Sequence, residues 1–254
     1  SRLNRKETYL PIFTLVVVAL LGAADDYLNI KGIGKSKGIN VKPKFLWLTL
    51  FATLGALWFH FKLGYDQIHL PGIGDFFIGF WYIPLFILII VATANAVNIT
   101  DGLDGLAGGL SIIAFGCFAG LAYVQGLMLL AAFCMVIVGA TLAFLWFNIP
   151  PAKFYMGDTG ALSLGATLGV IAMLTDSVLI LPFVGFIFVI ETLSVIIQLT
   201  SKKLFKKKVF HIAPLHHHFE HLGWPESKVT MRFWMIGGIV AGFGLILGLV
   251  GMGI

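Results

Sequence analysis

Acidic and amide side chains stand close together in one short segment between two apolar runs. The segment NAVNITDGLDGLAGG, residues 95–109, carries Asn98, Asp101 and Asp104 at intervals of three residues. One helical turn would place these three side chains roughly on one side. Amide and carboxylate groups in such an arrangement could hydrogen-bond a base or a sugar. The same residues could instead form an Asx-rich turn that caps the next helix.

Further carboxylates lie where predicted helices end or begin. Asp25 and Asp26 close an apolar run, at the negative end of the helix dipole, so lysines that follow or a metal ion should compensate them. Paired carboxylates suit proton abstraction or divalent-metal binding, although a polar pair can also simply end a helix at a membrane surface. Asp158 follows Gly157 in FNIPPAKFYMGDTG, where free N–H groups at a helix start favour an anion. Asp158 could bind Mg²⁺ that bridges phosphate oxygens, or act as a plain N-cap.

A histidine-rich segment, APLHHHFEHLGWPE, places imidazoles after a run of lysines. The consecutive residues His216, His217 and His218 would point about 100° apart on a helix and could not all serve one ligand set. His217, Glu220 and His221 match the H-x-x-E-H pattern of zinc proteases, but the sequence shows no other element of such an enzyme. We therefore expect these imidazoles to bind an anionic group or, at His217, to assist proton transfer.

The elements that must position these groups are strongly apolar. Of the 254 residues, 59% are hydrophobic and 11% are charged, with a mean hydropathy of +0.96. The apolar runs are continuous rather than alternating, which disfavours a membrane β-barrel. Because one crossing needs about 20 apolar residues, we predict an all-α polytopic transmembrane bundle, a single membrane domain over 1–254. The eight predicted spans are 9–24, 45–62, 80–97, 106–125, 127–147, 160–176, 178–199 and 230–252.

The distribution of basic residues predicts which loops face the cytoplasm. Thirteen of the seventeen lysines and arginines fall in or beside the loops 25–44, 98–105, 148–159 and 200–229. The positive-inside rule makes this side cytoplasmic. The polar segments described above all lie on the same side, so we predict one composite active site at the cytoplasmic face. The outer loop 64–75 carries little that resembles a site.

One acidic residue lies within a predicted span. Glu191 shares a helical stripe with Ser194 and Gln198. A charge at the bilayer centre costs roughly 2.5–3.5 kcal/mol on insertion scales, so Glu191 should face the bundle interior or a cavity.

The sequence resembles the polyprenyl-phosphate N-acetylhexosamine-1-phosphate transferase superfamily. The resemblance rests on three segments that occur in this order and on one face: ADDY, NAVNITDGLDGLAGG and FNIPPAKFYMGDTG. Within that superfamily, APLHHHFEHLGWPE followed by VTMRFW resembles the phospho-N-acetylmuramoyl-pentapeptide transferase family. The resemblance covers essentially the whole sequence. It implies ten transmembrane helices with an outer N-terminus, so we expect the first two helices of the family to be missing from this sequence.

The resemblance also implies an activity in peptidoglycan biosynthesis at the bacterial cytoplasmic (inner) membrane. Members transfer phospho-MurNAc-pentapeptide from UDP-MurNAc-pentapeptide to undecaprenyl phosphate, with Mg²⁺ as cofactor, and form lipid I and UMP. It further implies a homodimer, contacts with membrane lipids, inhibition by nucleoside antibiotics of the tunicamycin or muraymycin type, and no nucleic-acid partner.

By the same resemblance, particular residues receive roles. Asp25 matches the carboxylate proposed to deprotonate or position the lipid phosphate, Asp26 stands beside it, and Asp158 matches the Mg²⁺ ligand. With His217, these are the expected catalytic residues. The expected substrate-binding residues are Asn98, Asp101, Asp104, Asn148, Tyr155, Gly157, Gln198, Ala213, His216, His218, Lys37 and Lys44. Tyr155 stands where the family usually has Phe, which preserves stacking and adds a hydroxyl group.

Phosphoryl transfer between two anions needs charge neutralisation and in-line positioning. We therefore expect the lipid phosphate to attack the β-phosphate directly, with an Asp nucleophile and a covalent intermediate as the alternative. Two other functions stay open. A related UDP-GlcNAc:polyprenyl-phosphate GlcNAc-1-phosphate transferase is disfavoured by the triple-His motif. A membrane transporter could also carry Glu191 and basic loops, but it predicts polar residues along a through-pathway rather than on one face.

Overall fold

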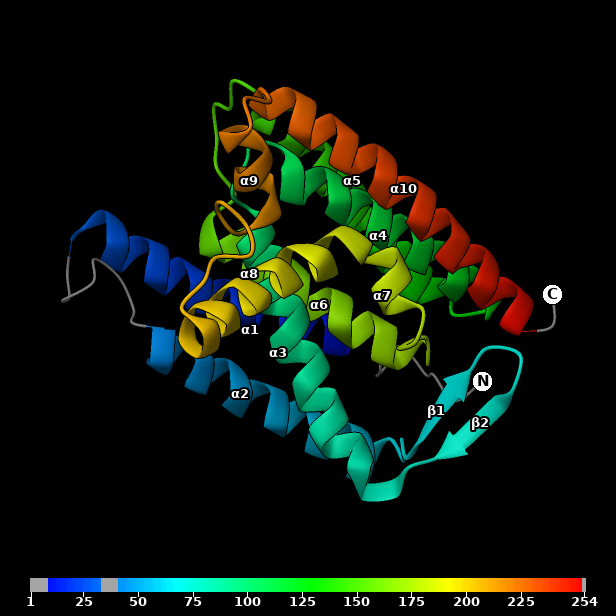
Figure 1. Ribbon diagram of the computed structural model, residues 1–254. Coiled ribbons are helices and arrows are strands. Elements are labelled where there is room, and N and C mark those ends of the chain that lie inside the picture. The colour runs from blue at the N-terminus through cyan, green and yellow to red at the C-terminus, as the bar shows by residue number, and fades with distance from the viewer. Residues whose placement is uncertain (1–8, 33–40, 253–254) are drawn as a thin grey trace.

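The computed structural model describes residues 9–32 and 41–252, and these residues form a bundle made mainly of helices (Figure 1). In this part of the chain, seven helices are long and apolar enough to cross a membrane. Lys37 lies outside the described residues. The seven helices confirm the predicted all-α membrane bundle. They are α1 (Tyr9–Ile30), α2 (Val41–Leu57, continued by a π-helical turn, Trp58–Lys62), α3 (Tyr82–Thr100), α4 (Leu106–Val124), α5 (Met128–Asn148), α6 (Gly157–Leu174) and α10 (Glu226–Gly251).

The predicted span 178–199 is divided in two. A four-residue helix, α7 (Leu181–Val184), ends at Gly185, and α8 (Phe186–Phe205) begins directly after it. The twenty residues of α8 include Glu191, Lys202 and Lys203, so this helix is less apolar than the seven spans. The prediction of one continuous apolar span at this position was therefore wrong.

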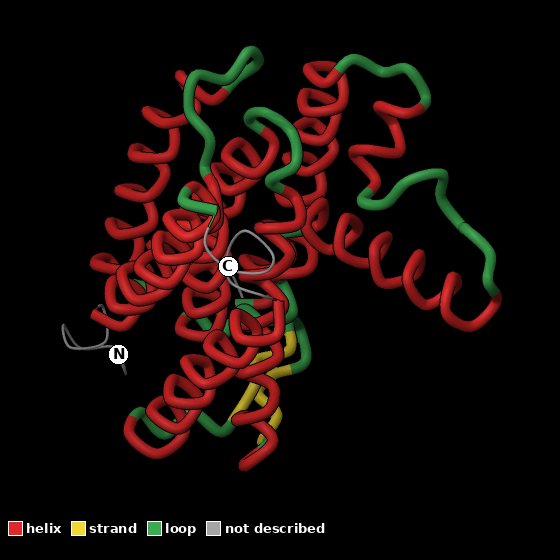
Figure 2. The backbone as a smooth tube through the Cα atoms, turned by 90° about the vertical axis from the view of Figure 1, so that its left-hand side faces the viewer, coloured by secondary structure: helices red, strands yellow, loops and turns green. Residues whose placement is uncertain are grey.

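Two elements had no counterpart among the predictions. The loop 64–75 contributes to an antiparallel hairpin of β1 (Gln67–Leu70) and β2 (Gly74–Phe77), followed by a 3-10 turn (Gly79–Trp81). The hairpin lies at one end of the bundle (Figure 2). The histidine-rich segment forms the short helix α9 (Leu215–His221) between α8 and α10.

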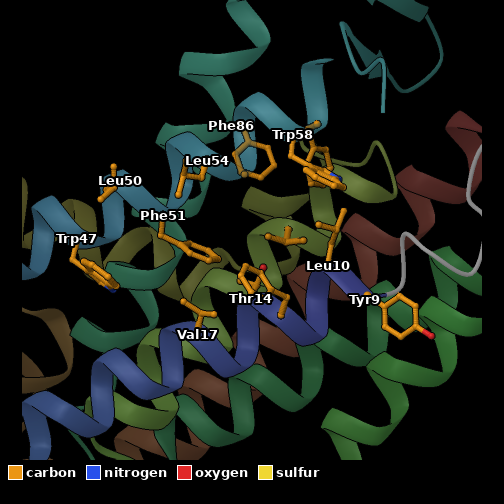
Figure 3. A pocket seen from close by; sticks show the side chains of 14 residues that line it. Tyr9, Leu10, Thr14, Val17, Trp47, Leu50, Phe51, Leu54, Trp58 and Phe86 are labelled. Carbon is orange, nitrogen blue, oxygen red and sulfur yellow. The ribbon is translucent and has the colours of Figure 1, made fainter. Parts of the chain in front are cut away.

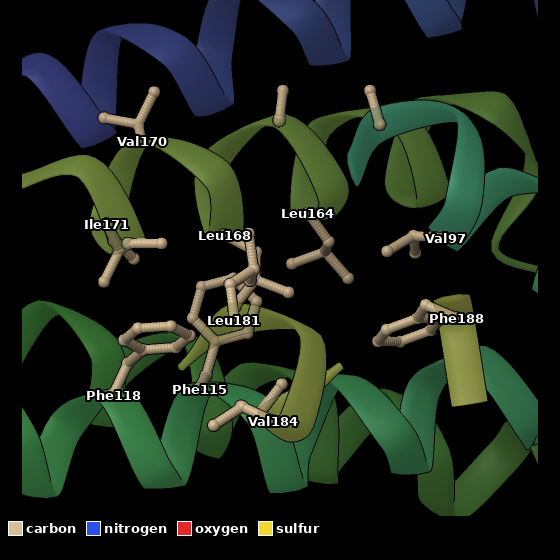
Figure 4. Packing of buried hydrophobic residues seen from close by; sticks show 14 of the residues in the cluster. Val97, Phe115, Phe118, Leu164, Leu168, Val170, Ile171, Leu181, Val184 and Phe188 are labelled. Atoms are coloured by element: carbon tan, nitrogen blue, oxygen red, sulfur yellow. The ribbon is translucent and has the colours of Figure 1, made fainter. Parts of the chain in front are cut away.

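The centre of the bundle is α6, which packs against both α1 and α3. Figure 4 shows Leu168 and Ile171 of α6 close to Phe115 and Phe118 of α4 in the core. A glycine allows the closest approach to α3, because a Cβ atom at Gly165 would lie 2.5 Å from the carbonyl oxygen of Thr93. Small residues at helix contacts are the usual means of close packing in membranes.

Helices α1 and α2 rest on different neighbours, α1 on α6 and α2 on α3. Between them lies an apolar groove of about 630 Å³ (Figure 3). Its walls include Phe13 and Val17 of α1 and Trp47 and Leu54 of α2, and Phe86 of α3 contributes as well. The groove therefore runs between two membrane-spanning helices.

Candidate active site

Three carboxylates converge where α1 meets the start of α6. Asp25 and Asp26 of α1 and Asp158 of α6 each offer an oxygen atom, and these oxygens lie within 4.8 Å of one another. We call these three residues the acidic cluster. The helices approach closely because a glycine faces the junction: a Cβ atom at Gly22 would lie 2.4 Å from the carbonyl oxygen of Asp158. Hard divalent cations prefer such oxygen ligands, so the acidic cluster fits a divalent metal ion.

Two other helices add polar groups to the acidic cluster. From α2, Lys44 Nζ donates to Asp25 Oδ2 at 2.7 Å and also to Asp158 Oδ2. From α3, Asn98 Nδ2 donates to Asp158 Oδ1 at 2.6 Å. Lys44 thus compensates Asp25, one member of the acidic pair. One ammonium group beside three carboxylates still leaves room for further positive charge.

The anion at the start of α6 is a side chain of the protein, the Asp26 carboxylate. The carboxylate of Asp26 accepts hydrogen bonds from the backbone N–H groups of Asp158 (3.2 Å) and Thr159 (3.0 Å). The Thr159 hydroxyl also donates to it, at 2.5 Å. Gly157 has a φ of +62°, and a Cβ atom there would lie 2.8 Å from Asp26 Oδ2. Asp26 therefore satisfies the N–H groups that the sequence pattern offered to a phosphate.

Two of the simpler interpretations of these acidic residues fail. The N-cap residue of α6, Met156, makes no side-chain capping hydrogen bond, and the Asp158 carboxylate faces Lys44 and Asn98. The N-cap residue of the next helix, α4, is Gly105, which has a φ of +76° and makes no side-chain capping hydrogen bond. Asp158 is therefore not a plain N-cap, and the segment 95–109 is not an Asx cap for α4.

Asp101 follows α3 directly and has an unusual acidity. The pKa of Asp101 is raised to about 7, with burial as the largest cause. Neighbouring carboxylates add to this shift, Asp158 first, then Asp26 and Asp104. The acidic cluster therefore lies near a fourth carboxyl group, which holds a proton over much of the range below neutral pH.

Two predicted substrate-binding residues instead connect loops within the protein. The Asp104 carboxylate accepts a hydrogen bond from the Ala152 N–H at 2.9 Å. Asn148 is 3% exposed; its Oδ1 accepts from the Gly105 N–H (3.1 Å), and its Nδ2 donates to the Phe154 carbonyl (2.8 Å). These contacts hold the loop after α5 against the loop before α4. In contrast, the Tyr155 ring is 77% exposed and open to a ligand.

Gln198, on the same helical stripe as Glu191, holds the segment that follows α8. Gln198 Oε1 accepts hydrogen bonds from the N–H groups of Val209 and Phe210, both at 3.0 Å, and its Nε2 donates to the Phe210 carbonyl at 2.8 Å. Ala213 and His211 line, with Gln198, a small hollow of about 250 Å³. Gln198 is thus mainly engaged with the backbone of this segment.

The three histidines of α9 meet three different environments, as the helical spacing predicted. His216 is fully buried beside Glu191. His217 Nδ1 lies 2.6 Å from Glu220 Oε2 on a partly exposed surface. The ring of His218 stacks on that of His211 at 5.4 Å. Within the described residues, the acidic cluster is the one group of three His, Cys, Asp or Glu side chains at metal-binding spacing. The residues of the zinc-protease pattern therefore do not form a ligand set.

The loop between α3 and α4 joins the two halves of the site. Asp101 lies near the acidic cluster. The next residue, Gly102, lies against α9, because a Cβ atom there would be 2.2 Å from His216 Nε2. This loop, from Asp101 to Gly105, belongs to one of the four polar segments found in the sequence, and the other three surround it.

Sequence reasoning missed the partners of two acidic residues in this region. Glu226 Oε1 accepts a hydrogen bond from the Asp104 N–H at 2.6 Å, and no sequence signal indicated this contact. Glu191 accepts one from the His216 N–H at 3.0 Å. Its position within an apolar helix was a signal that it needed a partner, and its burial confirms that it faces the bundle interior.

Comparison with known proteins places this site in a family context. Residues 9–176 match the model of glycosyl transferase family 4, a range that includes the acidic cluster but not α9. The chain is 42% identical to a phospho-N-acetylmuramoyl-pentapeptide-transferase of Chloroflexus aggregans, over 97% of this chain and 71% of that protein. Enzymes of the same name from a Geobacillus species (strain WCH70) and Pelagibacter ubique are each 43% identical to it. Those two matches cover 94% and 92% of this chain, and 74% and 71% of the respective relatives.

Proposed function

Because the chain belongs to glycosyl transferase family 4 and, within it, to the phospho-N-acetylmuramoyl-pentapeptide-transferases, we propose that it forms lipid I from UDP-MurNAc-pentapeptide and undecaprenyl phosphate, with release of UMP. The observation that carries this proposal is the acidic cluster with Lys44 beside it. Both substrates present phosphate groups, so the reaction requires positive charge and fixed positions rather than unusual side-chain chemistry.

Magnesium is the proposed cofactor, and the donor set of the acidic cluster supports it. Asp26 is engaged with the start of α6, so Asp25 and Asp158 are the residues that would hold the ion. When bound, Mg²⁺ would neutralise charge on the diphosphate oxygens of the donor. Lys44 contacts both of these carboxylates and supplies a second positive charge at the same place.

In the proposed reaction, an oxygen of the lipid phosphate attacks the β-phosphorus of the donor. A new P–O bond forms as the bond from this phosphorus to the bridging oxygen breaks, and UMP leaves with that electron pair. Asp25, 7% exposed and 2.7 Å from Lys44 Nζ, positions the lipid phosphate or accepts its proton. Nucleoside recognition is proposed for the neighbouring loop and for the exposed Tyr155 ring.

The acceptor would reach this site from the bilayer. The seven membrane-length helices make the chain a multi-pass membrane protein. An apolar polyprenyl chain finds a matching surface in the groove between α1 and α2, whose wall residue Trp47 follows Lys44 by one helical turn. We further propose the bacterial inner membrane, a cytoplasmic orientation of the site, a homodimer, and inhibition by nucleoside antibiotics.

The test is UMP release by the membrane-embedded protein and its Asp25→Asn and Asp158→Asn variants across a Mg²⁺ titration. Loss of either charge should lower turnover by about 10²–10³-fold, in the range seen when one group that stabilises a transition state is removed. Asp75→Asn is the matched control, because Asp75 lies on the distant hairpin. Normal activity of both site variants would overturn the assignment of the site.

The same assay separates the other functions. UMP release from UDP-GlcNAc, but not from UDP-MurNAc-pentapeptide, would indicate the related GlcNAc-1-phosphate transferase. Substrate flux into liposomes without UMP release would indicate a transporter. Retention of configuration at the β-phosphorus would favour the covalent alternative over direct attack.

A further inference from the structure

A buried pair of side chains links α8 to α9. Glu191 of α8 and His216 of α9 are both 0% exposed. Glu191 Oε1 accepts a hydrogen bond from the His216 N–H at 3.0 Å, and Glu191 Oε2 lies 3.2 Å from His216 Nδ1. The second contact has the distance of an ion pair but not the alignment of a hydrogen bond, since neither atom has a hydrogen-bond partner in the described chain. The Glu191 carboxylate thus holds the backbone of His216 and lies at ion-pair distance from its imidazole.

The far side of this imidazole faces the loop that joins α3 and α4. His216 Nε2 has no hydrogen-bond partner among the described residues, and it lies where the side chain of residue 102 would begin. A Cβ atom at Gly102 would be 2.2 Å from Nε2 and 2.9 Å from Cε1 of the same ring. The ring therefore forms a support on which the backbone of this loop rests.

The backbone that rests on His216 carries Asp101, the residue beside the acidic cluster. Fully buried beneath Gly102, the His216 side chain has no surface left for a ligand. Its neighbours in the triple-His motif differ, since the side chain of His217 is 42% exposed. The position of His216 suits support of the loop better than direct contact with the substrate.

We propose that Glu191 and His216 are positioning residues for the donor side of the site, and that they act by fixing the loop from Asp101 to Gly105. The proposal rests on the proposed transferase function and deepens it. It differs from the expectation that His216 binds substrate. Displacing this loop would alter recognition of the UDP-linked donor, while the lipid acceptor, on the side of α1 and α2, would bind as before.

The first experiment replaces the carboxylate by an isosteric amide. Glu191→Gln keeps the length of the side chain but removes its charge. We expect the KM for UDP-MurNAc-pentapeptide to rise about tenfold, with the KM for undecaprenyl phosphate within about twofold of the wild type, because a small misplacement of a positioning element has a large kinetic effect. Ser194→Ala is the matched control: Ser194 is 2% exposed, lies on the same stripe of α8, and donates only within its own helix.

The two possible roles of Glu191 predict different kinetics. If Glu191 only maintained the fold, Glu191→Gln would reduce the active fraction, lowering the apparent kcat with both KM values unchanged. A change in both KM values by the same factor, or wild-type kinetics in Glu191→Gln, would also overturn the proposal. Absence of UMP release from the wild-type protein would overturn the proposed function itself, so the two failures are distinguishable.

The second experiment tests the contact through which the pair acts. Gly102→Ala places a methyl group against His216 Nε2. The rate of UMP release from UDP-MurNAc-pentapeptide should fall by about tenfold or more. In a His216→Ala background the obstructing ring is absent, so adding Gly102→Ala should change the activity by less than about twofold, the signature of coupled residues. Gly116→Ala is the control, because no other element of the described chain lies within 4 Å of a Cβ atom there. Equal effects of Gly102→Ala in both backgrounds would contradict the proposal.

Discussion

The two ends of α6 differ in how their polar groups are balanced. At its C-terminal end, donors from other elements meet acceptors one for one: Gln125 Nε2 donates to the Thr175 carbonyl at 2.8 Å, and the His69 N–H donates to Asp176 Oδ1 at 3.2 Å. At its start, the carboxylates of Asp25 and Asp158 share a single ammonium group, and a third carboxylate, that of Asp26, accepts from the N–H groups of the helix.

This difference separates a structural junction from a candidate site. A helix end whose polar groups all have hydrogen-bond partners requires no ligand to satisfy them. An excess of carboxylates is unfavourable by itself and becomes favourable when a cation binds. Changes at the start of α6 should therefore affect activity strongly, and changes at the hairpin end should affect only stability.

The largest effect is expected from Gly22→Ala, which removes the close approach of α1 to α6. The added Cβ atom would lie 2.4 Å from a backbone oxygen, which cannot move away as a flexible side chain can. We expect a loss of about 1–3 kcal/mol in the free energy of unfolding. UMP release should fall about tenfold or more, because the acidic cluster spans this junction.

Thermal unfolding and UMP release of the purified protein are the measurements. Gly139→Ala is the matched control, since no other element of the described chain lies within 4 Å of a Cβ atom at that position. Equal behaviour of the two variants would show that the α1–α6 junction tolerates separation.

An intermediate effect is expected from Lys44→Met. Removing the ammonium group leaves the acidic cluster with more negative charge, so a divalent cation should bind about five- to tenfold more tightly. Turnover should fall at the same time, because Lys44 supplies charge to the reacting phosphates in the proposed reaction. Binding of Mn²⁺, followed by its spectroscopic signal, measures the affinity directly.

Lys62→Met, at the opposite end of the same membrane span, serves as the control. Weaker cation binding in Lys44→Met would mean that the ammonium group arranges the carboxylates rather than competing for them.

The smallest effect is expected at the hairpin end. The hydrogen bond to Asp75 raises the pKa of His69, with smaller contributions from the Gly251 carbonyl and the charge of Asp176. The folded-state pKa is therefore above the usual value of 6.5, and the charged imidazole stabilises the fold. This contribution is complete below pH 6.5 and is lost as the pH rises through the folded-state pKa.

Unfolding midpoints of the wild type and His69→Gln between pH 5 and pH 9 measure this contribution. Because Asp75 is 58% exposed, we expect less than about 1 kcal/mol, present at low pH and absent at high pH. UMP release should be unchanged in His69→Gln. A large loss of activity in this variant would break the distinction between the two ends of α6.

Most of the membrane architecture was predictable because a transmembrane helix is a local feature. A continuous apolar run of sufficient length requires an internally hydrogen-bonded helix, whatever packs against it. Seven spans could be placed in this way. The division of the eighth at Gly185 could not be foreseen, because apolar residues continue on both sides of the break. The hairpin also escaped detection, since its pairing depends on tertiary contacts such as that of His69 with Asp176.

The amino-acid sequence by itself determined which residue types are available for chemistry and that they gather on one face. Only the tertiary structure decided which of them meet. It assigned Asp26 to the start of α6 rather than to a free carboxylate pair, with a hydrogen bond between residues 133 positions apart. It also brought Lys44 to the acidic cluster and buried His216 between Glu191 and Gly102. Hydropathy is a property of each segment alone, whereas these contacts depend on how closely separate helices pack.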